Sequence, residues 1–172
     1  MIKVFFRQCG ETYGEQHAAA YKLLYAAAAF CGDEVSSAEI KRTDMGKPYF
    51  PDRSDLFFSL SHSGRYAVCA IGDIPCGVDI EKNREIPHRV CDRYLGGAVG
   101  KDAICRWTMR ESFGKIGGGG FFKGDNIPDD AVFGFFEYED YFMAVCACGY
   151  DGAFPIYRSE QGIFIPAGYM KA

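Results

Sequence analysis

The chain has 172 residues and carries a formal net charge of −4 at neutral pH. Hydrophobic residues make up 48% of it and aromatic residues 16%, which is enough apolar surface for a globular core and too much for a disordered chain. The acidic balance argues against a general nucleic-acid-binding protein, because such a protein needs a basic surface. No apolar run is as long as a membrane span, and the N-terminal one is too short for a secretory leader, so we expect a cytoplasmic protein.

The cysteine pattern agrees with that expectation. Eight cysteines without an export signal indicate reduced thiols in a cytoplasm. None of them forms a CxxC pair of the kind that binds zinc, and Cys146 and Cys148 share one face of a predicted strand. We therefore interpret the cysteines as small buried hydrophobic residues.

The first half of the chain predicts a strand, a helix and three further strands. Residues 2–7 are typical of a short strand, and residues 15–31 carry large side chains at helical spacing before Gly32, a typical helix stop. Residues 56–71 predict two strands on either side of a polar turn. A third short strand is expected at residues 78–81.

The second half predicts a helix and two strands. Residues 102–116 have helical spacing, and the glycines of 117–120 must form a loop because glycine is costly inside a helix. Residues 132–136 and 141–148 are expected to be strands. The tail after them, with Pro155 and Pro166, is predicted to be irregular.

An internal repeat indicates that the two halves are related. Residues 67–72, AVCAIG, recur as residues 144–149, AVCACG, and in both places a predicted helix precedes the strand pair. The repeat and the order of elements together predict an α+β fold built from two similar halves.

Two carboxylates in the third predicted strand are the first candidate site residues. Side chains alternate along a strand, so Asp79 and Glu81 share one face. Like charges side by side repel unless a cation lies between them, and paired carboxylates suit magnesium. The alternative is a solvated edge strand in which the two residues have no function.

A second candidate group lies on the predicted helix at 102–116. Trp107, Glu111 and Lys115 are four residues apart and therefore lie along one face. Glu111 and Lys115 can form a surface ion pair without function. The functional interpretation has Glu111 in a metal site and Lys115 at a phosphate.

A histidine between two serines is the third candidate. Ser61, His62 and Ser63 precede Gly64, and together these residues could offer several hydrogen-bond donors to a phosphate. Serine–histidine nucleophilic catalysis is a weaker interpretation, because neighbouring residues in a strand point to opposite faces. A structural histidine is the alternative.

The order of these motifs resembles a known enzyme family. Four motifs follow one another along the chain: Gly46-Lys47-Pro48-Tyr49-Phe50, Ser59-Leu60-Ser61-His62-Ser63-Gly64, Gly77-Val78-Asp79-Ile80-Glu81, and the helix segment from Trp107 to Lys115. This order resembles the 4'-phosphopantetheinyl transferase superfamily, and more closely its surfactin-synthetase-activator type. The likeness runs from about Gly46 to Gly118 and more loosely to Cys148.

The resemblance implies a fold and a metal site. The family fold is a pseudo-dimer of two α+β halves, here expected at residues 1–78 and 79–172, with the active site in the cleft between them. By resemblance, Asp79, Glu81 and Glu111 would hold magnesium. Glu111 or a bound water would deprotonate the acceptor serine, and Lys115 would stabilise charge on the phosphates.

The resemblance also implies how the coenzyme is bound. His62 with Ser61 would contact the 3'-phosphate of the adenosine, Lys47 and Pro48 would lie along the nucleotide, and Lys115 would meet the phosphates. Members of this type carry a longer N-terminal region with basic residues for the nucleotide, so this chain is expected to be a shortened member.

The implied function is transfer of the 4'-phosphopantetheine group from coenzyme A to a serine of an acyl, peptidyl or polyketide carrier protein, which releases adenosine 3',5'-bisphosphate. The alternative is a non-catalytic relative that binds coenzyme A and magnesium but has lost carrier modification. The segment from Lys82 to Lys115 holds eight basic and four acidic residues, which could attract an acidic carrier. No nucleic-acid or membrane partner is expected, and a chain with both halves is expected to act as a monomer.

Overall fold

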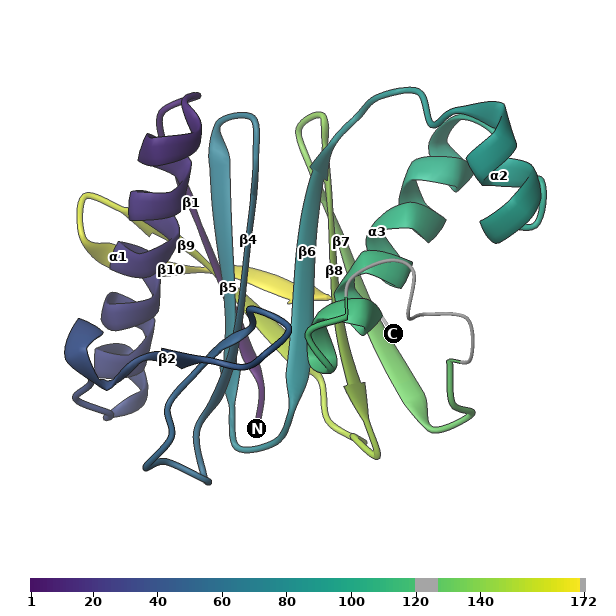
Figure 1. Ribbon diagram of the computed structural model, residues 1–172. Coiled ribbons are helices and arrows are strands. Elements are labelled where there is room, and N and C mark those ends of the chain that lie inside the picture. Colours follow the sequence, from purple (N-terminus) through teal and green to yellow (C-terminus); the bar gives the residue numbers. More distant parts are fainter. Residues whose placement is uncertain (120–126, 171–172) are drawn as a thin grey trace.

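The described residues fold into two larger β-sheets whose inner faces share one core, with a long helix over the outer face of each, and a separate two-stranded sheet of β2 and β3 (Figure 1). This computed structural model describes residues 1–119 and 127–170. The elements in chain order are β1 (Lys3–Gln8), α1 (Tyr13–Cys31), the 3₁₀ turn η1 (Ser37–Glu39), β2 (Lys41–Arg42), β3 (Pro48–Tyr49), β4 (Phe57–Ser63), β5 (Tyr66–Gly72), β6 (Cys76–Lys82), α2 (His88–Tyr94), α3 (Gly100–Ile116), β7 (Ala131–Tyr138), β8 (Tyr141–Cys148), β9 (Phe154–Glu160) and β10 (Ile163–Met170).

The order of strands shows the internal repeat. In the first sheet β1, β5 and β4 are neighbours in that order, and in the second sheet β6, β8 and β7 repeat it. Each unit is a strand, a helix and a hairpin whose second strand lies in the middle, and the repeated sequence falls on β5 and β8. The predicted α+β class with two similar halves is confirmed. The predicted boundary between residues 78 and 79 falls inside β6, and the division into domains at that point stays a prediction.

The prediction of an irregular tail was wrong, because the tail forms β9 and β10. β9 pairs in parallel with β1 of the first sheet, and β10 pairs antiparallel with β9. Proline lacks a donor N–H and is tolerated where a strand begins or bulges, or at a sheet edge. Pro155 is the second residue of β9, and Pro166 lies in the edge strand β10 where the register shifts. The C-terminal strands therefore complete the N-terminal sheet.

Helix α1 has sequence signals at both ends. Thr12 and Glu15 form a capping box, in which the Thr12 hydroxyl accepts from the backbone N–H of Glu15 and the Glu15 carboxylate accepts from that of Thr12. Gly32 ends the helix with a φ of 91°, as its place after the last helical residue predicted. The core face of α1 carries Leu23 and Leu24, which pack against the first sheet.

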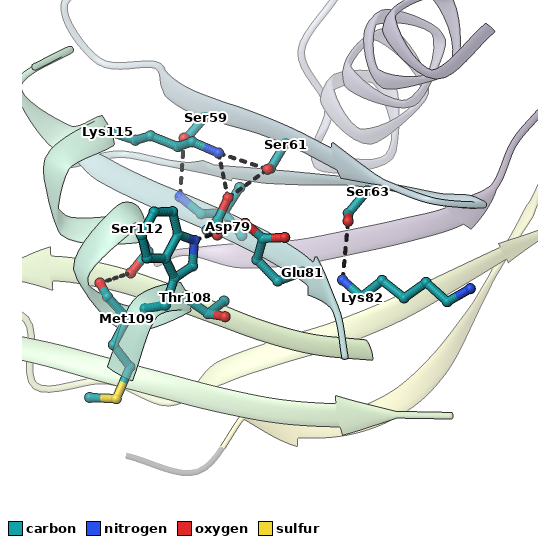
Figure 2. A network of polar contacts seen from close by, with 12 residues as sticks. Ser59, Ser61, Ser63, Asp79, Glu81, Lys82, Thr108, Met109, Ser112 and Lys115 are labelled. Atoms are coloured by element: carbon teal, nitrogen blue, oxygen red, sulfur yellow. Dashed lines mark hydrogen bonds and ion pairs between the residues drawn. The ribbon is translucent and has the colours of Figure 1, made fainter. Parts of the chain in front are cut away.

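Serine hydroxyls join the two sheets along β4 and β6. These strands belong to different sheets yet lie side by side (Figure 1). Figure 2 shows that Ser59 Oγ accepts from the backbone N–H of Val78 at 3.1 Å, and Ser63 Oγ accepts from that of Lys82 at 3.1 Å. We call this junction of β4 and β6 the serine seam. The two serine hydroxyls satisfy backbone N–H groups of the edge strand β6, although β4 and β6 are not joined by a ladder of backbone hydrogen bonds.

Strand β6 also approaches α3 closely. A Cβ at Gly77 would lie 1.9 Å from the backbone oxygen of Ser112, so only glycine fits there. The buried residues of α3 are mostly small or polar, and they include Thr108, Ser112 and Gly114. Thr108 donates its hydroxyl proton to the Ile104 carbonyl, which satisfies a buried polar group within the helix. The close approach fixes the position of α3 over β6.

Three further predictions concern thiols, a loop and membrane spans. All eight cysteines are free thiols, and Cys69, Cys76, Cys91 and Cys146 are buried. The predicted glycine loop begins where α3 ends, but residue 120 lies outside the described residues. Among the helices that the structure describes, none has both the length and the apolar character needed to cross a membrane.

Replacement of Gly77 tests the packing of β6 on α3. Gly77→Ala should lower the free energy of unfolding by at least about 2 kcal/mol, because the new methyl group meets backbone rather than a movable side chain. Urea unfolding followed by circular dichroism measures the change. Gly14→Ala is the control, since a Cβ at that helical position has open space and should leave stability unchanged or raise it by less than about 1 kcal/mol. Equal effects of the two variants would contradict this packing.

Candidate functional site

A cavity of about 570 Å³ extends from α1 to α3 across the serine seam. All the site residues predicted from sequence line it, although they come from four separated segments: Lys47, Pro48, Ser61, His62, Asp79, Glu81, Glu111 and Lys115. The fold therefore brings the four motifs to a single place. Their individual roles depend on the contacts that each side chain makes.

Asp79 is the most buried of the candidate acids, with 4% of its surface exposed. Its Oδ1 atom accepts from the Ser61 hydroxyl at 2.7 Å and pairs with Lys115 Nζ at 2.7 Å (Figure 2). Lys115 Nζ also donates to Ser61 Oγ at 2.7 Å, which closes a triangle between β4, β6 and α3. The other oxygen, Oδ2, is buried with no hydrogen-bond partner among the described residues. One lone oxygen of this carboxylate is thus available to a further donor or cation.

Glu81 accepts hydrogen bonds from two other residues, Trp107 and Arg84. The Trp107 indole N–H donates to Glu81 Oε1 at 2.8 Å, and Arg84 Nη2 donates to the same oxygen at 3.2 Å. The Arg84 guanidinium lies 5.2 Å from the centre of the Trp107 ring, a cation–π contact. Asp79 and Glu81 both line the cavity, as predicted for two residues on one face of β6.

Glu111 has a strongly raised pKa. Burial and the nearby carboxylates of Asp79 and Glu81 raise its pKa to about 7, although Lys115 and Arg84 act in the opposite direction. A carboxylate with this pKa exchanges a proton near neutral pH, which suits a general base. It also gains from any cation placed among the three acids, because the repulsion that raises the pKa would be relieved.

The three carboxylates suit magnesium by their chemistry, although the described conformation uses them differently. Hard oxygen ligands, one lone buried oxygen on Asp79 and mutual repulsion at Glu111 all favour a divalent cation. Among the described residues, however, no group of three or more acids, histidines or cysteines lies in an arrangement that could hold a metal ion. In this conformation Lys115 supplies the positive charge to Asp79. The metal site at Asp79, Glu81 and Glu111 stays a prediction.

Ser61 and His62 point to different neighbours, as strand alternation predicts. The Ser61 hydroxyl contacts Asp79 of β6 and Lys115 of α3. The His62 ring instead makes an edge contact with Tyr13 of α1, with 5.5 Å between the ring centres. Burial, and then the Lys115 charge, lower the pKa of His62. A joint contact of both residues with one phosphate stays a prediction, because the Ser61 hydroxyl is already used by Asp79 and Lys115.

Lys47 lies at the end of α3. Its Nζ donates to the Ile116 carbonyl at 2.7 Å, which satisfies one of the free carbonyls at the helix C-terminus. Burial lowers the pKa of Lys47. Pro48 follows in β3, so this part of the chain forms one wall of the cavity.

Sequence reasoning missed the wall that α1 contributes. Tyr13, His17 and Tyr21 line the cavity together with Arg42. Part of the signal was present, since the three aromatic residues stand four apart in the sequence, but Tyr13 precedes the predicted helix at residues 15–31 and joins the row because α1 begins at Tyr13. No site role was predicted for these three residues, which the structure places at the cavity.

The pair of Asp79 and Lys115 should be energetically coupled. Lys115→Met removes the ammonium from a buried carboxylate and should cost about 1–3 kcal/mol in urea unfolding, since Lys115 is partly exposed. In the Asp79→Asn background the same change should cost much less. Lys101→Met is the control, because the Lys101–Glu137 pair is largely exposed and should contribute under about 1 kcal/mol. A Lys115→Met cost that is the same in both backgrounds would refute the coupling.

Comparison with known proteins supports the resemblance seen in the sequence. One relative is 4'-phosphopantetheinyl transferase Sfp of Bacillus subtilis (strain 168), which is 32% identical over 110 residues. Another is a 4'-phosphopantetheinyl transferase of Bacillus subtilis, 34% identical over 100 residues. A third is 4'-phosphopantetheinyl transferase gsp of Aneurinibacillus migulanus, 29% identical over 94 residues. The matches cover 57%, 51% and 48% of this chain and 47%, 43% and 39% of the relatives, so the chain spans about half the length of the proteins it matches. No family model matches the chain. The predicted resemblance is confirmed, and this chain is related to the 4'-phosphopantetheinyl transferases of the Sfp type.

Proposed function

We propose that this protein transfers the 4'-phosphopantetheine group of coenzyme A to a serine of a carrier protein. The observation that carries the proposal is the convergence of three acids and a lysine on one cavity, together with the similarity to proteins of that name. Transfer of a phosphoryl-type group mainly needs positioning and neutralisation of charge, and these side chains supply both.

The proposed reaction uses Glu111 and Lys115. Glu111, directly or through a water, takes the proton of the carrier serine. The serine oxygen then bonds to the phosphorus next to the pantetheine arm. The bond from that phosphorus to the bridging oxygen breaks, and the electron pair leaves with adenosine 3',5'-bisphosphate. Lys115 stabilises the negative charge on the phosphates.

Magnesium is part of the proposal. Asp79, Glu81 and Glu111 would hold the ion, since the unpartnered oxygen of Asp79 and the repulsion at Glu111 favour a cation there. When bound, magnesium would neutralise charge on the diphosphate of coenzyme A. The Lys115 ammonium, which neutralises Asp79 in the described conformation, would then serve the phosphates instead.

The carrier surface proposed from sequence lies between Lys82 and Lys115. Among the described residues, ion pairs with acidic side chains of the chain itself already involve Lys82, Arg84, Lys101, Arg106 and Lys115. Arg89 and Arg93 of α2 are exposed and are the better candidates for an acidic carrier. Both halves of one chain line the cavity, which supports action as a monomer, and the cytoplasmic location stays a prediction.

A mass measurement tests the transfer. The protein, coenzyme A, magnesium and an apo-carrier should give a carrier heavier by one phosphopantetheine group, and Glu111→Gln should reduce the rate at least about 100-fold because the base is lost. Glu137→Gln is the matched control, since Glu137 pairs with Lys101 at an exposed position and should leave the rate unchanged. Full activity in Glu111→Gln would refute the mechanism. Coenzyme A binding without transfer to any of several carriers would favour the non-catalytic relative.

The single tryptophan offers a test of the metal site that does not depend on activity. Trp107 donates to Glu81, so magnesium at that carboxylate should change the tryptophan fluorescence. Titration with magnesium alone should give a saturable change, and Asp79→Asn should weaken the apparent affinity at least about tenfold, as even outer-shell changes commonly do. Glu137→Gln should titrate like the unchanged protein. The same affinity in Asp79→Asn would remove Asp79 from the site.

A further inference from the structure

Helix α1 presents a row of aromatic side chains to the cavity. Tyr13, His17 and Tyr21 stand on successive turns and all line it. The ring centres of Tyr13 and His17 are 6.0 Å apart, and those of His17 and Tyr21 are 4.9 Å apart. Tyr25 continues the row at 6.5 Å from Tyr21, but it does not belong to the cavity lining. We call Tyr13, His17 and Tyr21 the aromatic row.

Tyr21 is half-buried and packs against the core of the first sheet, but core packing does not explain the cavity-lining ring of Tyr13. Tyr13 is 72% exposed, and the buried face of α1 consists of other residues, namely Ala19, Ala20, Leu23, Leu24, Ala27 and Ala28. Aromatic rings that face water inside a hollow gain little for folding, whereas they offer flat apolar surface to a ligand. The row therefore points to a binding role.

Contacts at both ends hold the row in place. The His62 ring of β4 meets Tyr13 edge-on at 5.5 Å. At the other end Arg42 donates to the Tyr21 hydroxyl at 3.1 Å and to the Gly46 carbonyl at 2.9 Å. Rings that are already ordered lose little conformational freedom when a ligand stacks on them. The rings of the row are therefore ordered before a ligand binds.

The two ends of the cavity differ in chemistry, which orients the ligand. Asp79, Glu81, Glu111 and Lys115 lie toward α3, where the proposed function puts the diphosphate. The aromatic row lies on α1, at the opposite side of β4 and β6 (Figure 1). Coenzyme A has one flat heteroaromatic group, the adenine base, at the far end from the pantetheine arm. A base has a π-face that stacks on aromatic side chains, whereas the amide-linked arm has none.

We propose that the aromatic row is the stacking platform for the adenine base of coenzyme A. This inference rests on the proposed function, because the diphosphate position sets the orientation. Tyr13 and Tyr21 contribute ring surface, and Arg42 acts as a positioning residue that fixes Tyr21. The rings would give the nucleotide apolar contact surface beside the Arg42 guanidinium, which also lines this side of the cavity.

Calorimetry with three probes tests the platform: coenzyme A, adenosine 3',5'-bisphosphate and inorganic pyrophosphate. Tyr13→Ala and Tyr21→Ala should each raise the Kd of the first two probes by a similar factor of about ten, since one stacked ring is removed. The Kd of pyrophosphate should not change. Tyr13→Phe should bind like the unchanged protein, because stacking uses the ring and not the hydroxyl.

Tyr25→Ala is the matched control, on the same helix but outside the cavity lining, and should change no Kd. Alanine favours the helix, so folding should persist in each of these variants. An equal loss of pyrophosphate binding would overturn the platform, as would unchanged binding of all probes. A loss confined to coenzyme A would overturn it too, because the row would then hold the pantetheine arm.

The outcomes separate this inference from the proposed function. If the unchanged protein modifies a carrier while Tyr13→Ala and Tyr21→Ala bind normally, only the platform fails. If adenosine 3',5'-bisphosphate binds in a way that depends on Tyr13 and Tyr21 but no carrier is modified, the platform stands and the proposed function fails. An unchanged protein that binds none of the three probes contradicts both.

Discussion

The position of strand β6 is the constraint on which the site depends. One side of β6 is tied to β4 through the serine seam, and the other approaches α3 so closely that a Cβ at Gly77 would collide with the Ser112 backbone. Asp79 comes two residues later, and its place between Ser61 and Lys115 follows from these two contacts. The backbone packing of β6 thus sets the distances between side chains from three elements.

Electrostatics at this junction make the site responsive to a cation. A buried carboxylate destabilises the fold unless it is paired. Asp79 is stabilised by an ion pair with Lys115 and a hydrogen bond from the Ser61 hydroxyl. Glu111, one helical turn before Lys115, makes no comparable ion pair with the described residues, and burial and its acidic neighbours raise its pKa to about 7. Lys115 pairs with Asp79 and Arg84 pairs with Glu81, whereas Glu111 makes no such pair within the part of the chain that the structure describes, so the site retains a demand for positive charge.

Local rules predicted most of what the site uses, and long-range pairing accounts for what they missed. Strand alternation was enough to direct Asp79 and Glu81 to one cavity, and helical spacing was enough for Glu111 and Lys115. The strands β9 and β10 were missed because Pro155 and Pro166 oppose a strand locally, and their pairing with β1 connects distant parts of the chain. The aromatic row was missed because helical spacing alone does not distinguish a face that packs on the core from one that lines a cavity.

The two ends of the cavity divide the work of binding between different forces. Toward α3, the site would bind the charged groups of a ligand through ion pairs and hydrogen bonds, which burial strengthens because the local dielectric is low. Toward α1, where the row meets the cavity, the available surface is aromatic and its attraction does not depend on net charge. In a protein with a net charge of −4, the proposed aromatic platform would add to the attraction that Arg42 and Lys47 of the same cavity offer an anionic nucleotide. That division also explains why Tyr13 remains 72% exposed: its ring is part of the cavity and not of the core.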